Sequence, residues 1–144
     1  MNTANSRQAA APDLSIEALE AGTADPGGFD HEAHVYTAWL YLQRFETLEA
    51  MQKYSAALRR LTIKLGVETK YHQTITWFFL LLIAERRGSA ETDNWLQFKA
   101  RNEDLFCVDT PILSRYYSPS TLDSGFARTH FVLPDLLLKN HVAA

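Results

Sequence analysis

Helix start and stop signals recur along this chain, and apolar residues at helical spacing lie between them. Asp30 is a good N-cap residue, and Phe29 before it can form a hydrophobic staple. Gly66 and Gly88 each follow an apolar stretch and are typical of helix ends. Runs of alternating β-branched residues between turn pairs, which would indicate strands, are nearly absent. The pattern predicts an all-α fold.

Three stretches are long enough for helices of several turns. We expect three longer helices, the first starting after Asp30 and the others covering residues 47–65 and 68–87. The expected buried stripe of the second helix is Leu48, Met51, Leu58, Leu61 and Leu65. In the third helix, the run WFFLLLIA is expected to be the central buried stretch.

Shorter helices are expected towards the C-terminus. One covers residues 92–102, with its two aromatic residues directed inward. Proline is favoured at the first helical position because its missing N–H has no intrahelical partner there. Pro111 after Thr110 and Pro119 after Ser118 therefore mark two further helix starts. The chain is predicted to be a single-domain helical bundle of three longer helices and two or three short ones.

The first 28 residues differ from the rest of the chain in composition. They are rich in Ala, Ser, Thr, Asp and Gly and contain no aromatic residue. Residues 14–21 have the pattern of a short helix, but such chain ends are usually mobile. We expect residues 1–28 to form a mobile N-terminal arm and residues 29–144 to form one packed domain.

Charge and hydropathy restrict the partners. The net charge is −3 and the basic residues form no large patch, which argues against nucleic acid as a partner. The longest apolar run has eight residues, whereas a membrane span needs about 20. With no secretory signal pattern, cytoplasm is the expected location. The single cysteine, Cys107, is expected to be a small buried residue. A homodimer would use the same kind of apolar residues as the core.

Three histidines form the candidate site. His31 and His34 lie three residues apart, so their rings can face one spot on a helix surface. If the first and third longer helices pack side by side, His72 can meet this pair. Three imidazoles with an open position are typical of a catalytic site for zinc, and imidazole also suits iron and copper. The alternative is that these histidines are solvated or structural.

A polar cluster near the C-terminus offers groups that could orient a small-molecule substrate. Tyr117 and Arg128 lie in it, and Tyr71 precedes His72. Arg128 could hold a carboxylate or a phosphate. The alternative is an internal ion pair of Arg128 with Asp135 and tyrosines packed at a helix junction.

Three separated stretches, FDHEAHVYTAWLYL, GVETKYHQTITWFF and SRYYSPSTLDSGFARTHFVLPDL, resemble a family of small all-helical bacterial proteins. The resemblance covers about residues 29–136. The family pattern falls here on Asp30, His31, His34, Tyr71, His72, Thr74, Tyr117, Ser118, Leu122, Ser124, Ala127, Arg128, Pro134 and Asp135. No activity comes with this resemblance. It implies that the three histidines recur as a set, without His130.

Three hypotheses remain open from the sequence. The first is a metal-dependent enzyme, in which His31, His34 and His72 bind one divalent ion of iron, copper or zinc. In it, Tyr71, Tyr117 or Arg128 would orient a small substrate. The second is a metal-free enzyme in which a histidine acts as an acid or base. The third is a non-catalytic interaction protein with structural histidines. A deep polar pocket near His72 would favour the second over the third.

Overall fold

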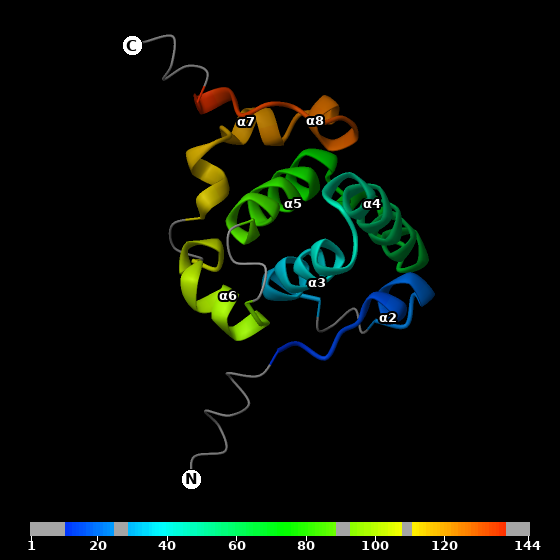
Figure 1. The fold of residues 1–144 in the computed structure, drawn as a ribbon. Helices are drawn as coiled ribbons and strands as arrows, with labels where there is room; N and C mark the ends of the chain where they lie inside the picture. The colour runs from blue at the N-terminus through cyan, green and yellow to red at the C-terminus, as the bar shows by residue number, and fades with distance from the viewer. Residues whose placement is uncertain (1–10, 25–28, 89–92, 108–110, 138–144) are drawn as a thin grey trace.

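The computed structural model describes residues 11–24, 29–88, 93–107 and 111–137, and these residues contain no strand. Three longer helices form the centre of the molecule (Figure 1). They are α3 (His31–Arg44), α4 (Thr47–Lys64) and α5 (Gln73–Arg87), and each packs against the other two. The predicted all-α bundle of three longer helices with additional short ones is therefore confirmed.

The first longer helix, α3, begins where the cap pattern predicts. The Asp30 side chain accepts a hydrogen bond from the backbone N–H of Ala33 at 2.9 Å, which satisfies one of the free donors of the first turn. Val35, Ala38 and Tyr41 lie on the buried side of α3. His31 and His34, at the start of the helix, lie outside this buried side.

Helix α4 ends at the predicted glycine. Gly66 has a φ of 69°, and Val67 donates its backbone N–H to Thr62, as in a left-handed helix C-terminus. Two members of the predicted stripe are wrong, because Leu48 is 69% exposed and Leu65, directly after the last residue of α4, is also exposed. At 3.6 residues per turn, Leu48 lies about 120° around the helix from the buried Tyr54 and so points away from the core.

Helix α5 starts five residues later than predicted. Residues Glu68–Lys70 form a separate 3-10 turn, η2, and α5 begins at Gln73. The cause is His72, which has an extended backbone and caps the helix with its own side chain. From there α5 crosses the centre of the bundle, where Leu80 and Ile83 are fully buried.

Short helices cover the remaining sides of the bundle (Figure 1). They are α6 (Trp95–Arg101), η3 (Glu103–Leu105), η4 (Ile112–Arg115), α7 (Pro119–Leu122) and α8 (Gly125–Thr129). Trp95 and Phe98 are buried as predicted, and Ser118 caps α7 directly before Pro119. The predicted cap Thr110 lies outside the described residues. Helix α8 packs against α5 near its N-terminal end through the hydrogen bond from Thr74 to Ala127.

Part of the chain before Phe29 contributes to the same core. Helix α2 (Ile16–Ala21) confirms the short helix predicted there, and its side chains Ile16 and Leu19 are buried. Lys64 at the end of α4 donates to the backbone oxygen of Gly22 at 2.7 Å. These contacts hold α2 against the bundle.

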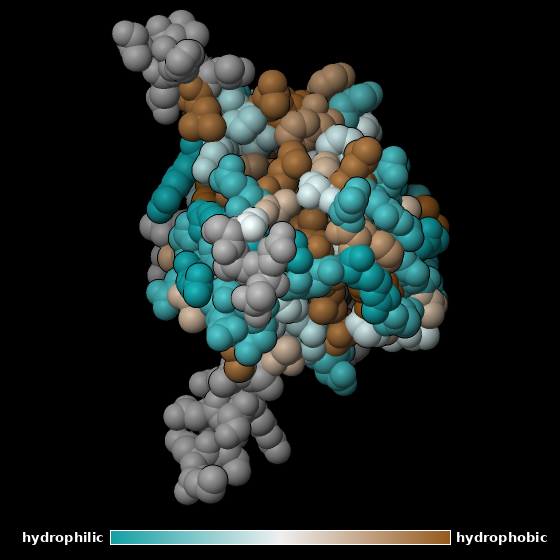
Figure 2. Space-filling model, in the orientation of Figure 1, coloured by the Kyte–Doolittle hydropathy of each residue, from teal (hydrophilic) through white to brown (hydrophobic). Residues whose placement is uncertain are grey.

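Two surface features complete the fold. Cys107 is exposed, so its predicted burial is wrong; η3 ends with the buried Leu105, and the chain then turns outward. Apolar residues also reach the surface around α7 and α8 (Figure 2), where Phe126 and Leu133 are more than 60% exposed. None of the helices in the described ranges combines the length and the apolar character that crossing a bilayer requires.

Candidate functional site

A pocket of about 800 Å³ lies between the N-terminal ends of α3 and α5, the C-terminal half of α4 and η2. Its apolar lining is Phe29, Val35, Ala38, Leu58, Leu61, Leu65, Val67, Ile75 and Phe79. Its polar lining is Asp30, His31, His34, Tyr54, Thr62, Lys70, Tyr71, His72 and Thr76. The volume falls in the range of small-molecule sites, about 300–1,000 Å³. All three predicted histidines face this one pocket.

His31 uses one of its ring nitrogens to hold the pocket wall. Its Nε2–H donates to the backbone oxygen of Leu105 at 2.7 Å, which fixes the tautomer and leaves the Nδ1 lone pair free. Phe79 and Phe106 contact the ring edge to face, with centroids 5.3 Å and 6.5 Å away. The start of α3 is thereby tied to the turn η3.

His34 differs from His31 because neither of its ring nitrogens forms a hydrogen bond within the described part of the chain. Its ring packs edge to face on Phe29, with centroids 4.4 Å apart. His34 is exposed as a residue, but its ring faces the pocket, where neighbouring protein atoms displace part of its hydration shell. This desolvation, and secondarily the charge of His31, lower the pKa of His34 to about 4, while Asp30 opposes the shift. His34 is therefore a neutral imidazole at pH 7.

His72 uses both of its ring nitrogens. Its Nδ1 accepts the backbone N–H of Ile75 at 3.2 Å as the cap of α5. Its Nε2 therefore carries the proton, which it donates to the backbone oxygen of Leu122 at 2.8 Å. No lone pair remains on the ring for another ligand.

This arrangement does not assemble the predicted metal centre. No three His, Cys, Asp or Glu side chains in the described ranges are placed to hold one metal ion. Ligation by His72 would break either the cap of α5 or the bond to Leu122. The metal-ligand role of His31, His34 and His72 stays a prediction.

Tyr71 is the one predicted orienting residue that lines the pocket. Its hydroxyl donates to the side-chain oxygen of Gln73, which also accepts from Arg59 at 3.1 Å. The Arg59 guanidinium lies over the Tyr71 ring, 4.9 Å from its centroid. The Tyr71 oxygen is thereby held in place and can still accept a hydrogen bond.

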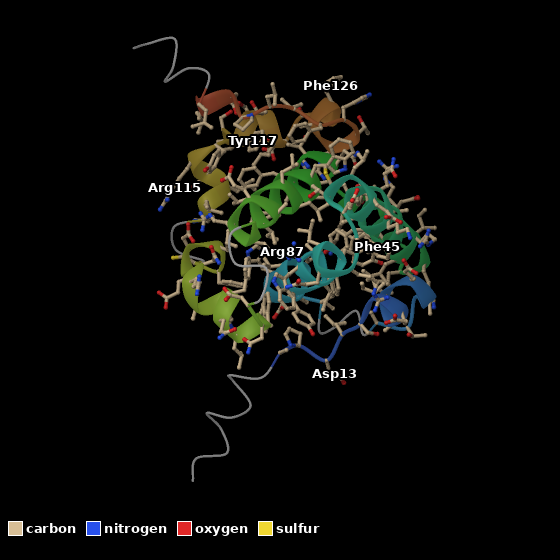
Figure 3. All side chains as sticks on the ribbon, viewed as in Figure 1. Asp13, Phe45, Arg87, Arg115, Tyr117 and Phe126 are labelled. Atoms are coloured by element: carbon tan, nitrogen blue, oxygen red, sulfur yellow. The ribbon has the colours of Figure 1, made fainter. Side chains whose placement is uncertain are left out.

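Tyr117 and Arg128 do not line this pocket. Tyr117 lies on the segment that leads into α7 (Figure 3), packs against Phe78 and donates its hydroxyl to Val132 at 2.6 Å. Burial, and secondarily the charge of Asp135, raise the pKa of Tyr117 to about 12. Arg128 is exposed and donates to the backbone oxygen of Thr69. Their contacts hold the C-terminal segment, Arg128 through Thr69 of η2, and within the described ranges no contact joins either side chain to one of the three histidines.

Tyr54 and Lys70 are among the pocket residues that the sequence did not predict. Tyr54 continues the stripe of α4 at helical spacing and is buried, with its hydroxyl bonded to Thr37 and to the backbone oxygen of His34. That spacing was a signal for it. Lys70 lies two residues before His72, but only the formation of η2 turns it towards the pocket.

A second, open depression of about 460 Å³ adjoins Lys99, Phe106 and Cys107. It contains none of the predicted site residues, and the histidine pocket is the better candidate because convergent polar groups meet apolar walls there.

Comparisons with models of protein families, with curated proteins and with solved structures find no match for this chain, so the site is interpreted from its own geometry.

Proposed function

We propose that the pocket is the active site of a metal-free enzyme that acts on a small molecule, with His34 as the proton acceptor. The observation that carries this proposal is an imidazole without hydrogen bonds among the described residues, facing an apolar-walled pocket of about 800 Å³. A general base needs a free lone pair within reach of the proton that it removes. His34 offers one, whereas His72 does not.

The neighbours of His34 suit this role. The charge of Asp30 favours the protonated ring, so the carboxylate would stabilise the imidazolium that forms when a proton is transferred. Tyr54 fixes the backbone at His34 through its hydroxyl. Tyr71 would accept a hydrogen bond from a polar group of the bound molecule. His72 is a positioning residue, because it ties the start of α5 to the end of α7.

A proton-abstraction probe tests the proposal without knowledge of the natural substrate. Nitrobenzisoxazole is a small aromatic compound that opens when a base removes its ring C–H proton; the N–O bond breaks and a coloured phenolate forms. We expect the protein to accelerate this reaction over an equal concentration of imidazole, and His34→Ala to lower the rate at least about tenfold. His130→Ala is the control, because His130 is exposed and stacks on Phe126 outside the pocket.

The pH dependence separates His34 from an ordinary surface histidine. Because the pKa of His34 is lowered to about 4, the rate should stay level from pH 7 down to pH 5. Free imidazole loses its basic form around its ordinary pKa of about 6.5 in the same range. Equal rates for the parent and His34→Ala would contradict the proposal.

Metal binding by His31 and His34 is the second candidate, because each keeps a nitrogen that bonds to nothing else among the described residues. The metal would be iron, copper or zinc, with its other positions open to substrate. The test is the metal content of protein purified without a histidine tag. Stoichiometric metal that is lost in both His31→Ala and His34→Ala would favour this candidate. If both tests fail, the non-catalytic interaction protein remains.

A further inference from the structure

We propose that the substrate of this pocket is an amphipathic monoanion, an apolar ring or chain that carries one carboxylate, with the carboxylate beside Lys70. This inference rests on the proposed function of the pocket and names the chemical class that it accepts. It rests on the lining of the pocket, which combines apolar walls with a single lysine and a single carboxylate.

The walls select an apolar body. Leu58 and Leu61 of α4 face the pocket, as does Leu65 directly after that helix, and Ile75 and Phe79 line it from α5. Leu65 is 39% exposed, so part of this apolar surface remains in contact with water. A ligand that covers it gains the free energy of removing apolar area from water, on its own side and on the side of the protein.

The charges select an anion. Lys70 is the one lysine or arginine among the described lining residues; it is exposed, and its ammonium group has no ion pair or hydrogen bond to another described residue. Asp30 is the one lining carboxylate, and its Oδ1 already accepts the N–H of Ala33. A cationic ligand would leave Lys70 uncompensated, and a dianion would leave one of its own charges without a partner. One carboxylate matches the one free ammonium group.

Two further features agree with this placement. The first turn of α5 begins three residues after Lys70 and contains no acidic residue, so the positive end of that helix adds to the attraction for an anion. An anion in the pocket would also favour the protonated form of His34. Substrate binding would thereby make His34 a stronger base at the moment when it is needed.

Phenylbutyrate and phenylbutanol test the inference, because they share an apolar body and differ in the carboxylate. We expect calorimetric titration of the full chain to show phenylbutyrate binding at least three times more tightly. Lys70→Met should remove this preference, while Lys53→Met should keep it, because Lys53 pairs with Glu49 outside the pocket. Leu65→Trp should weaken both compounds by filling the pocket.

A second readout is the NMR titration of the His34 ring, assigned by its loss in His34→Gln. Phenylbutyrate should raise the pKa of His34, and phenylbutanol should not. Equal affinity of the two compounds, or a preference that survives Lys70→Met, would overturn the anionic substrate class. Elimination of nitrobenzisoxazole that still depends on His34 would then leave the proposed function standing. Binding of both compounds that is unaffected by Leu65→Trp would remove the pocket as their site and overturn the inference.

Discussion

Replacing His72 by alanine removes two hydrogen bonds that join distant parts of the chain. The cap of α5 is worth about 1 kcal/mol, within a usual range of about 0.5–2 kcal/mol. The bond to the backbone oxygen of Leu122 adds about 0.5–1.5 kcal/mol. His72→Ala should therefore lower the free energy of unfolding by about 2 kcal/mol, and the melting temperature by about 4–8 °C for a chain of this size.

Two matched variants separate the contributions. Asparagine is a strong N-cap but is too short to replace the bond to Leu122, so His72→Asn should lose only about 1 kcal/mol. His34→Ala also removes an imidazole ring from this pocket, but it breaks no ring hydrogen bond within the described residues. It should lower the free energy of unfolding by less than about 1 kcal/mol.

Urea unfolding followed by circular dichroism measures all three variants. A purely metal-binding His72 predicts little change in the stability of metal-free protein. An unfolding free energy of His72→Ala within about 0.5 kcal/mol of the parent would refute the capping argument, because surface substitutions without structural partners change stability by no more than that. An asparagine variant as unstable as the alanine variant would refute it as well.

Further predictions concern the core, the C-terminal segment and pH. Leu58→Ala should cost about 2–5 kcal/mol in denaturant unfolding because it opens a cavity, whereas Leu48→Ala at an exposed site should stay within about 0.5 kcal/mol. Tyr117→Phe should cost about 1 kcal/mol in thermal unfolding through loss of its bond to Val132. Acidification from pH 6.5 to about 4 should lower the free energy of unfolding, because in this range His34 binds a proton in the unfolded chain but not in the folded one. His34→Gln should reduce this dependence of the unfolding free energy on pH.

The helix boundaries that the sequence predicted well depend on short-range contacts. Asp30 bonds three residues ahead of itself, and Ser118 does the same before Pro119. Such caps act within one turn, so their residue types reveal them without knowledge of the fold. The all-α class follows for the same reason, because helical spacing is a property of the chain itself. The common location of the three histidines was within reach only on the condition that α3 and α5 pack side by side, which the structure shows.

The chemistry of the histidines was decided by the tertiary structure. The partner of His31 lies 74 residues away at Leu105, and that of His72 lies 50 residues away at Leu122. Spacing shows that these rings can meet, but not which lone pairs remain free once ring N–H groups donate to distant backbone oxygens. The same long-range contact, together with the cap at Ile75, gives both ring nitrogens of His72 a hydrogen-bond partner, which the spacing of the histidines did not reveal. His34 keeps a free ring because no described backbone group reaches it, and a neighbourhood formed by packing alone sets its proton affinity.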